Sequence, residues 1–199
     1  MIIGLTGGSG CGKTTALQSL EELGALTFDA DAVYHELLER DEKLLAKLEE
    51  AFPGVLAEGK LDRRKLGSRV FGNPPALQKL NAITHPTVKK EIQKRIREGR
   101  KKGSKLFAID AFGLMEGKLD ALCDCTVAVL APREERIARI LRRDGIREKE
   151  AAARVDSQKS DEEFRRTCDY TLYNEKTEEE FRKTCRDFFQ KLIEEKSYE

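Results

Sequence analysis

The stretch Gly7-Gly-Ser-Gly-Cys-Gly-Lys-Thr-Thr15 decides the fold, because it stands between an apolar run and a helical pattern. The apolar run, Met1–Thr6 (MIIGLT), is typical of a buried strand in a parallel sheet. After the loop, Leu17–Leu23 carries leucines at helical spacing, and Gly24 ends that helix. A strand, a GxxxxGKT loop and a helix in this order predict a phosphate-binding loop.

The residue types of this loop are those that the phosphates of a nucleotide require. Glycine tolerates the backbone angles that turn N–H groups toward an anion, and it puts no side chain in the way. Lys13 can reach the β- and γ-phosphates, and the Thr14 hydroxyl can ligate Mg²⁺. The residues expected to contact the nucleotide are Gly8, Gly10, Cys11, Gly12, Lys13, Thr14 and Thr15.

Short apolar runs alternate with helical patterns along the rest of the chain. The further strands are predicted at Ala25–Phe28, Lys105–Ile109, Thr126–Leu130 and Tyr170–Tyr173. Residues 33–52 have a helical pattern, and the charged middle segment, residues 60–103, is predicted to be helical and free of strands. Thr177–Glu180 has the form of a capping box, which opens a final helix. This alternation predicts an α/β domain with a parallel sheet.

Composition excludes several classes of protein. The 199 residues include 37 Lys and Arg against 36 Asp and Glu, so the strong basic bias of a DNA-binding protein is absent. No apolar stretch reaches the roughly 18 residues of a membrane span, and no signal peptide is visible. Five irregularly spaced cysteines indicate reduced thiols. We expect a cytoplasmic monomer with no nucleic-acid or membrane partner.

A small kinase is the class of phosphate-loop protein that fits best. A regulatory GTPase needs Asn-Lys-x-Asp, and the nearest string, Asn174–Thr177, lacks the aspartate. Transport ATPases have a strand that ends in Asp-Glu, whereas Phe107–Ala111 has the aspartate alone. Seven arginines between residues 133 and 154 predict a lid that closes over the transferred phosphate, with Arg143 and then Arg139 nearest to it.

Two further patterns are candidates for the acceptor side of the site. Asp29-Ala-Asp31 follows the second strand, where the carboxyl ends of parallel strands face the ligand crevice. One aspartate is expected to cap the next helix, and Asp31 is the better candidate to orient or deprotonate a hydroxyl. His85-Pro86 is a lone histidine on a rigid step, which fits a structural histidine as well as a site wall.

The chain resembles the dephospho-CoA kinase family in matching segments that run in order over nearly its whole length. They are Leu5–Thr15, Leu23-Gly24, Asp29–Asp31, Asp62-Arg63, Val70-Phe71, His85-Pro86, Leu122–Asp124, Arg136, Arg143–Gly145, Gln158, Cys168–Tyr170 and Asn174. The resemblance implies a three-layer phosphate-loop kinase core with a helical CoA-binding insert and an Arg-rich lid. The boundaries we expect are 1–58, 104–141 and 167–199 for the core, 59–103 for the insert and 142–166 for the lid.

The resemblance also implies a reaction and residue roles. ATP is the donor, Mg²⁺ the cofactor, and the ribose 3′-hydroxyl of dephospho-CoA the acceptor. The implied catalytic residues are Lys13, Asp31 and Arg143; Asp31, Arg63 and His85 bind the acceptor, and Asn174 binds the nucleotide. The segment 110–116 lacks the proline of the family pattern. Another nucleotide or nucleoside kinase, or a nucleotide-binding regulatory protein, remains the alternative at this point.

Overall fold

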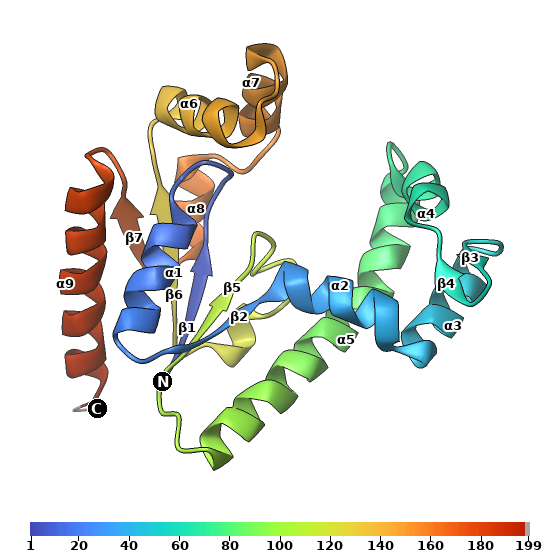
Figure 1. Ribbon diagram of the computed structural model, residues 1–199, viewed down its shortest axis with the longest axis horizontal. Coiled ribbons are helices and arrows are strands. Elements are labelled where there is room, and N and C mark those ends of the chain that lie inside the picture. Colours follow the sequence, from blue (N-terminus) through green and yellow to red (C-terminus); the bar gives the residue numbers. More distant parts are fainter. Residues whose placement is uncertain (198–199) are drawn as a thin grey trace. The chain divides into compact units, whose positions relative to one another are not determined.

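The computed structural model describes residues 1–197. They divide into two compact units: Met1–Phe28 with the chain from Gly99 onward, and Asp29–Glu98. The first unit contains the large sheet and the phosphate loop, and the second is mainly helical (Figure 1). Within residues 1–197, no helix has both the length and the apolar character that crossing a bilayer requires.

A parallel sheet is the centre of the first unit, with β1 as its middle strand. The strand order is β2-β5-β1-β6-β7, and β1 pairs in parallel with both β5 and β6. The strands are β1 (Ile2–Thr6), β2 (Leu26–Asp29), β5 (Phe107–Asp110), β6 (Cys125–Leu130) and β7 (Tyr170–Tyr173). Its helices are α1 (Lys13–Glu22), η1 (Asp120–Leu122), α6 (Arg133–Asp144), α7 (Glu148–Asp156), α8 (Asp161–Thr167) and α9 (Glu178–Ser197).

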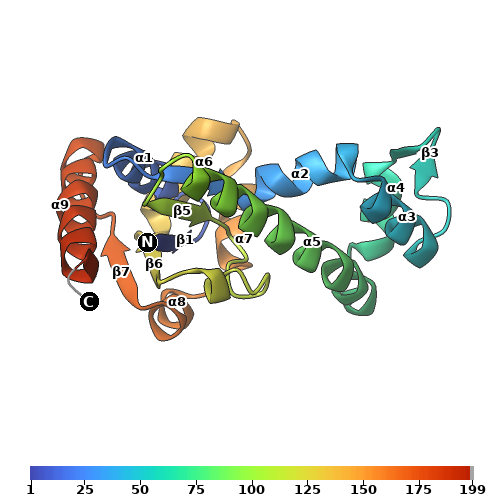
Figure 2. The ribbon, with the colours of Figure 1, turned by 90° about the horizontal axis from the view of Figure 1, so that it is seen from below.

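Helices cover both faces of this sheet, as the side chains of β6 show. Val127 and Val129 share one hydrophobic core with residues of α1 and α9. Ala128 and Leu130, which point the other way, pack with Phe164 of α8. Figure 2 shows α1 and α8 on opposite sides of the strands. The predicted three-layer α/β core is therefore confirmed.

The second unit has its own small core. Its elements are α2 (Ala30–Arg40), α3 (Glu42–Ala51), β3 (Leu56–Ala57), β4 (Lys60–Leu61), α4 (Arg63–Val70) and most of α5 (Pro74–Lys101). Leu38, Leu44 and Leu48 from α2 and α3 pack with Leu66 of α4 and Leu80 of α5. Because α2 and α3 share this core, the unit begins well before residue 59, where we placed the start of the insert.

One local prediction for the second unit was wrong, and another was confirmed. The segment 60–103 is not free of strands, because β4 pairs with β3 in an antiparallel hairpin. Glu58 and Gly59 both have positive φ, which suits a two-residue hairpin turn. The helical pattern of residues 33–52 is confirmed, and it is divided between α2 and α3, since Asp41 accepts a hydrogen bond from Leu44 N and caps α3.

The predicted lid, residues 142–166, has more apolar packing than its charge suggests. Ala151 and Val155 of α7 are buried against Ile137 and Ile140 of α6. Phe164 of α8 is buried on the sheet. The segment therefore consists of short helices that are anchored to the first unit at several points.

Candidate functional site

The phosphate loop follows β1 directly and leads into α1. Gly12 occupies the N-cap position of α1 with φ 101° and ψ 24°, a left-handed conformation that favours glycine. A Cβ at this position would lie 2.2 Å from the Asn174 side-chain nitrogen. Gly12 is therefore required both by the backbone and by the close approach of Asn174.

A cavity of about 230 Å³ opens at this loop. Its lining residues are Gly8, Ser9, Gly10, Gly12, Lys13, Thr14, Arg139 and Arg143. The cavity lies at the N-terminus of α1, where free backbone N–H groups and the helix dipole favour an anion. Three cationic side chains reach it, and no carboxylate is among its lining residues. Its shape, donors and charge suit a bound phosphate chain.

The carbonyl oxygens of the loop are bound by donors that come from several elements. Lys13 Nζ donates to Gly7 O at 3.0 Å, within the loop itself. Arg139 Nη1 donates to Gly10 O at 3.2 Å from α6. A carbonyl oxygen that pointed at a phosphate would repel it, so engaging these oxygens with cations leaves the loop better suited to an anion.

Asn174, which we predicted to bind the nucleotide, lies beside the loop backbone. Its side chain is buried and donates to Cys11 O at 2.9 Å, and its Oδ1 accepts from Arg139 Nη2 at 3.3 Å. These contacts connect α6 and the residue that follows β7 to the loop. Direct contact between Asn174 and a nucleotide stays a prediction.

Cys11 contributes to the loop without thiol chemistry. The side chain is 1% exposed, and this burial raises the pKa of the thiol above its usual value. A buried thiol with a raised pKa stays protonated at neutral pH and is a poor nucleophile. The expected contribution of Cys11, a small side chain and a backbone amide, agrees with this environment.

Thr14 is the residue that could ligate a metal ion. Within residues 1–197 no group of three or more His, Cys, Asp or Glu side chains could hold one. Mg²⁺ does not need such a cage, because it keeps several waters and takes further oxygens from substrate phosphates. The exposed Thr14 side chain lines the cavity, so one hydroxyl is available beside the phosphate position. The residues present fit Mg²⁺ bound together with a nucleotide.

Arg143 lies at the edge of the cavity near the end of α6. Its guanidinium donates twice to the Asp144 carboxylate, at 2.7 and 3.1 Å, and Arg154 donates to the same carboxylate at 2.6 Å. Hydrogen bonds from Arg143 and then Arg154 lower the pKa of Asp144 to about 2, so this carboxylate is ionised at neutral pH. With 63% of its side chain exposed, Arg143 lies both at the cavity and in this ion-pair group.

The two aspartates of the Asp29-Ala-Asp31 step have different environments. Asp29 ends β2 and caps α2, because its Oδ1 accepts from Asp31 N at 2.8 Å and from Ala32 N at 3.1 Å. The exposed Asp31 side chain takes no part in this cap. The capping role expected for one of the pair therefore falls to Asp29.

The predicted acceptor residues belong to the second unit. Arg63 begins α4, forms an ion pair with Glu39 at 3.2 Å, and lines a cavity of about 490 Å³. Lys60 and Leu61 of β4 line the same cavity. His85 is partly buried in α5, immediately before Pro86, which lies inside that helix.

Ser9 lines the phosphate cavity but was not predicted, whereas Arg139, which also lines it, was expected near the phosphate after Arg143. Arg139 had a signal in the sequence, because it lies one helical turn before Arg143 in the arginine-rich segment. Ser9 had none beyond its place in the loop. Which arginines of the cluster reach the loop depends on how α6 packs, and sequence spacing does not show this.

The sheet order, the glycine loop after the central strand and the cationic cavity together define the class of phosphate-loop small-molecule kinases. Solved structures agree: a Thermus thermophilus crystal structure matches with a TM-score of 0.80 and 31% identity, covering 98% of this chain and 97% of that one. Dephospho-CoA kinase from Campylobacter jejuni matches with a TM-score of 0.69 and 28% identity, covering 96% of each chain.

The family model for dephospho-CoA kinase matches residues 1–180. Dephospho-CoA kinase of Corynebacterium diphtheriae is 34% identical over 192 residues, which is 96% of each chain. The chain belongs to the dephospho-CoA kinase family, and the resemblance found in its sequence is confirmed. It is an ATP-using kinase of coenzyme A biosynthesis.

Proposed function

We propose that this chain transfers the γ-phosphoryl group of ATP to the ribose 3′-hydroxyl of dephospho-CoA at the cavity of the phosphate loop, giving coenzyme A and ADP. Family membership supports the reaction. The observation that carries the assignment of the site is that Lys13, Thr14 and Arg143 line one cavity at the N-terminus of α1. Phosphoryl transfer needs little covalent chemistry from the protein, so positioning and charge stabilisation decide the rate.

Lys13 and the arginines supply the positive charge. Lys13 donates to Gly7 O, and an ammonium has further N–H groups that can bind the β- and γ-phosphates. Arg143, with Arg139 beside it, stabilises the charge that develops on the transferred group. Thr14 would hold Mg²⁺, and the bound ion would supply positive charge to offset that of the phosphate oxygens.

Asp31 orients the acceptor hydroxyl and accepts its proton. It is exposed and takes no part in capping α2, whereas Asp29 is engaged by two backbone N–H groups. A carboxylate with this freedom is better suited to proton transfer than one that holds a helix N-terminus.

The segment 59–103 binds dephospho-CoA, and residues 142–166 act as the lid. Arg63 provides a guanidinium that suits the diphosphate of the acceptor, and the apolar wall at Leu61 suits its pantetheine arm. His85 forms part of the acceptor site within α5. Closure of the lid excludes water, which competes as a phosphoryl acceptor. A cytoplasmic location, a monomeric state, and the lack of nucleic-acid and membrane partners stay predictions.

The reaction is tested by measuring ADP release from ATP with a panel of acceptors. Dephospho-CoA is expected to support turnover, while AMP, dTMP and adenosine support little. A preference for one of the nucleotides or for adenosine would indicate another small-molecule kinase. Nucleotide binding without transfer to any of the four would indicate a regulatory protein.

A further inference from the structure

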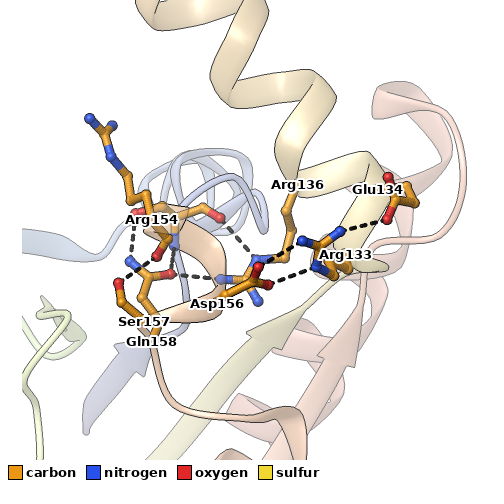
Figure 3. A network of polar contacts seen from close by, with 8 residues as sticks. Arg133, Glu134, Arg136, Arg154, Asp156, Ser157 and Gln158 are labelled. Atoms are coloured by element: carbon orange, nitrogen blue, oxygen red, sulfur yellow. Dashed lines mark hydrogen bonds and ion pairs between the residues drawn. The ribbon is translucent and has the colours of Figure 1, made fainter. Parts of the chain in front are cut away.

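Two side chains outside the cavity hold Ser9 of the phosphate loop. Ser9 N donates to Gln158 Oε1 at 2.9 Å, and Gln158 Nε2 donates to Ser9 Oγ at 2.8 Å. Arg136 Nε donates to Ser9 O at 3.0 Å. Arg136 Nη2 also donates to Gln158 Oε1 at 2.6 Å, as Figure 3 shows. All three polar groups of Ser9 are therefore bound by two side chains that also bind each other.

Burial makes this arrangement costly to break. Arg136 is 6% exposed, although a guanidinium is charged at every relevant pH. A buried charge is unfavourable unless its N–H groups are hydrogen-bonded, and the acceptors here are Ser9 O and Gln158 Oε1. Moving Ser9 away would leave this guanidinium without one of its acceptors.

Two loop glycines leave room for these side chains. A Cβ at Gly8 would lie 2.1 Å from Arg136 Nη2 and 2.9 Å from Gln158 Oε1. A Cβ at Gly10 would lie 2.5 Å from the backbone oxygen of Arg136. The glycines at these positions are explained by the close approach of α6 and Gln158, in addition to the approach of phosphates.

Gln158 lies in the link between α7 and α8, inside the segment predicted as the lid. The lid segment therefore contacts the loop directly through this side chain. A second contact attaches α7 to α6 without touching the loop: Arg133 donates twice to Asp156, each time at 2.7 Å (Figure 3). The Gln158 contact supports the loop, whereas the Arg133–Asp156 contact only attaches the lid segment to α6. Variants at the two contacts can therefore be compared.

We propose that Gln158 and Arg136 are positioning residues, which hold the phosphate loop in its nucleotide-binding conformation through Ser9 and so couple the α7–α8 link to nucleotide affinity. The inference rests on the proposed function only in taking this loop as the ATP site. Coupling is reciprocal, so a bound nucleotide stabilises the link by the same free energy as the link stabilises the bound nucleotide.

The test is the dissociation constant for ADP, measured by titration calorimetry on the whole chain. Gln158→Met keeps the approximate size of the side chain and removes its three polar contacts with Ser9 and Arg136. It is expected to weaken ADP binding roughly tenfold to a hundredfold, because hydrogen bonds that involve a charged group are lost. Arg136→Lys keeps the positive charge and loses the planar guanidinium that binds Ser9 and Gln158 together. It is also expected to weaken ADP binding. The KM for ATP rises in both variants, and the KM for dephospho-CoA does not.

Arg133→Ala is the matched control, because it removes a contact between α6 and α7 that does not reach the loop. It is expected to leave ADP binding unchanged. Wild-type ADP affinity in Gln158→Met, or an equal loss in Arg133→Ala, overturns the proposal. Failure of the proposed function looks different: the wild type would bind ADP and transfer nothing to dephospho-CoA, and the effect of Gln158 on ADP binding could still be measured.

Discussion

The phosphate loop and the second unit differ in how their candidate residues are held. In the loop, Ser9 and Cys11 are held by hydrogen bonds from the α7–α8 link, from α6 and from Asn174, the residue after β7. In the second unit, the exposed Asp31 and Arg63 lie near the starts of helices, and Arg63 has a surface ion pair. The phosphate loop is therefore held by hydrogen bonds from several elements, while the candidate acceptor residues of the second unit are exposed.

Under the proposed function, this difference suits the chemistry of the two substrates. The phosphate chain of ATP is bound largely by backbone N–H groups, which must be aligned before binding if they are to stabilise the transition state. An acceptor with a long flexible arm is bound by side chains over a larger surface. The contrast predicts that changes at the loop reduce turnover strongly, while changes in the second unit mainly affect acceptor binding, with Asp31 as the exception.

Lys13→Ala is expected to have the largest effect. Removing the ammonium deprives the β- and γ-phosphates of their nearest positive charge and should abolish measurable transfer. Turnover is measured beside circular dichroism, which should show an intact fold because Lys13 is only partly buried. Near-normal turnover in the folded variant would remove Lys13 from the mechanism.

Asp31→Asn is expected to reduce kcat by roughly 10²–10⁴-fold, because an amide keeps the shape but cannot accept the proton. The KM for dephospho-CoA should change little. Asp29→Asn is the matched control: the amide oxygen can still accept the two N–H groups of the α2 cap, so stability and kcat should both change little. A larger loss of kcat in Asp29→Asn than in Asp31→Asn would reverse the assignment of the two residues.

Arg143→Lys tests whether the lid arginine acts through its planar fork. Lysine keeps the charge and loses bidentate geometry, so we expect kcat to fall by roughly 10–100-fold. Asp144→Asn separates the phosphate role from the ion pair, since it removes the partner of Arg143 and leaves the guanidinium in place. If Asp144→Asn reduces kcat as much as Arg143→Lys does, the ion pair and not the phosphate contact explains the loss.

Arg63→Gln is expected to have the smallest effect. The KM for dephospho-CoA should rise roughly two- to fivefold with the KM for ATP unchanged, because an exposed charge contact is worth at most about 1 kcal/mol. Arg186→Gln, which removes an exposed ion pair with Glu22 on the first unit, is the control and should change neither KM. An effect of Arg63→Gln on ATP alone would argue against an acceptor role.

The sequence predicted the features of the fold that depend on local patterns. The loop, the strand at Tyr170–Tyr173 and the capping box at Thr177 were found at their observed places, because glycine spacing, apolar runs and caps act over a few residues. The β3–β4 hairpin was missed, since its strands are two residues long and show no alternation. The extent of the second unit was missed because it depends on the packing of α2 and α3 with α4 and α5.

The same holds for the site: residues in a local motif could be predicted, and residues placed by long-range packing could not. Lys13 and Thr14 belong to a motif in which spacing implies position, and both line the cavity. The contacts of Gln158 with Ser9 span 149 residues of sequence and have no local pattern. Such long-range supports became visible only when α6 and the α7–α8 link were placed beside the loop.

Transfer to the ribose 3′-hydroxyl is most directly tested by comparing dephospho-CoA with its 3′-deoxy analogue as phosphoryl acceptors. Both molecules present the same diphosphate and pantetheine arm, and only the first has the proposed nucleophile. With ATP, we expect ADP release and a phosphorylated product from dephospho-CoA, and neither from the analogue, which should instead inhibit competitively. Phosphorylation of the analogue at a similar rate would contradict the account, because the phosphoryl group would then be going to a different atom.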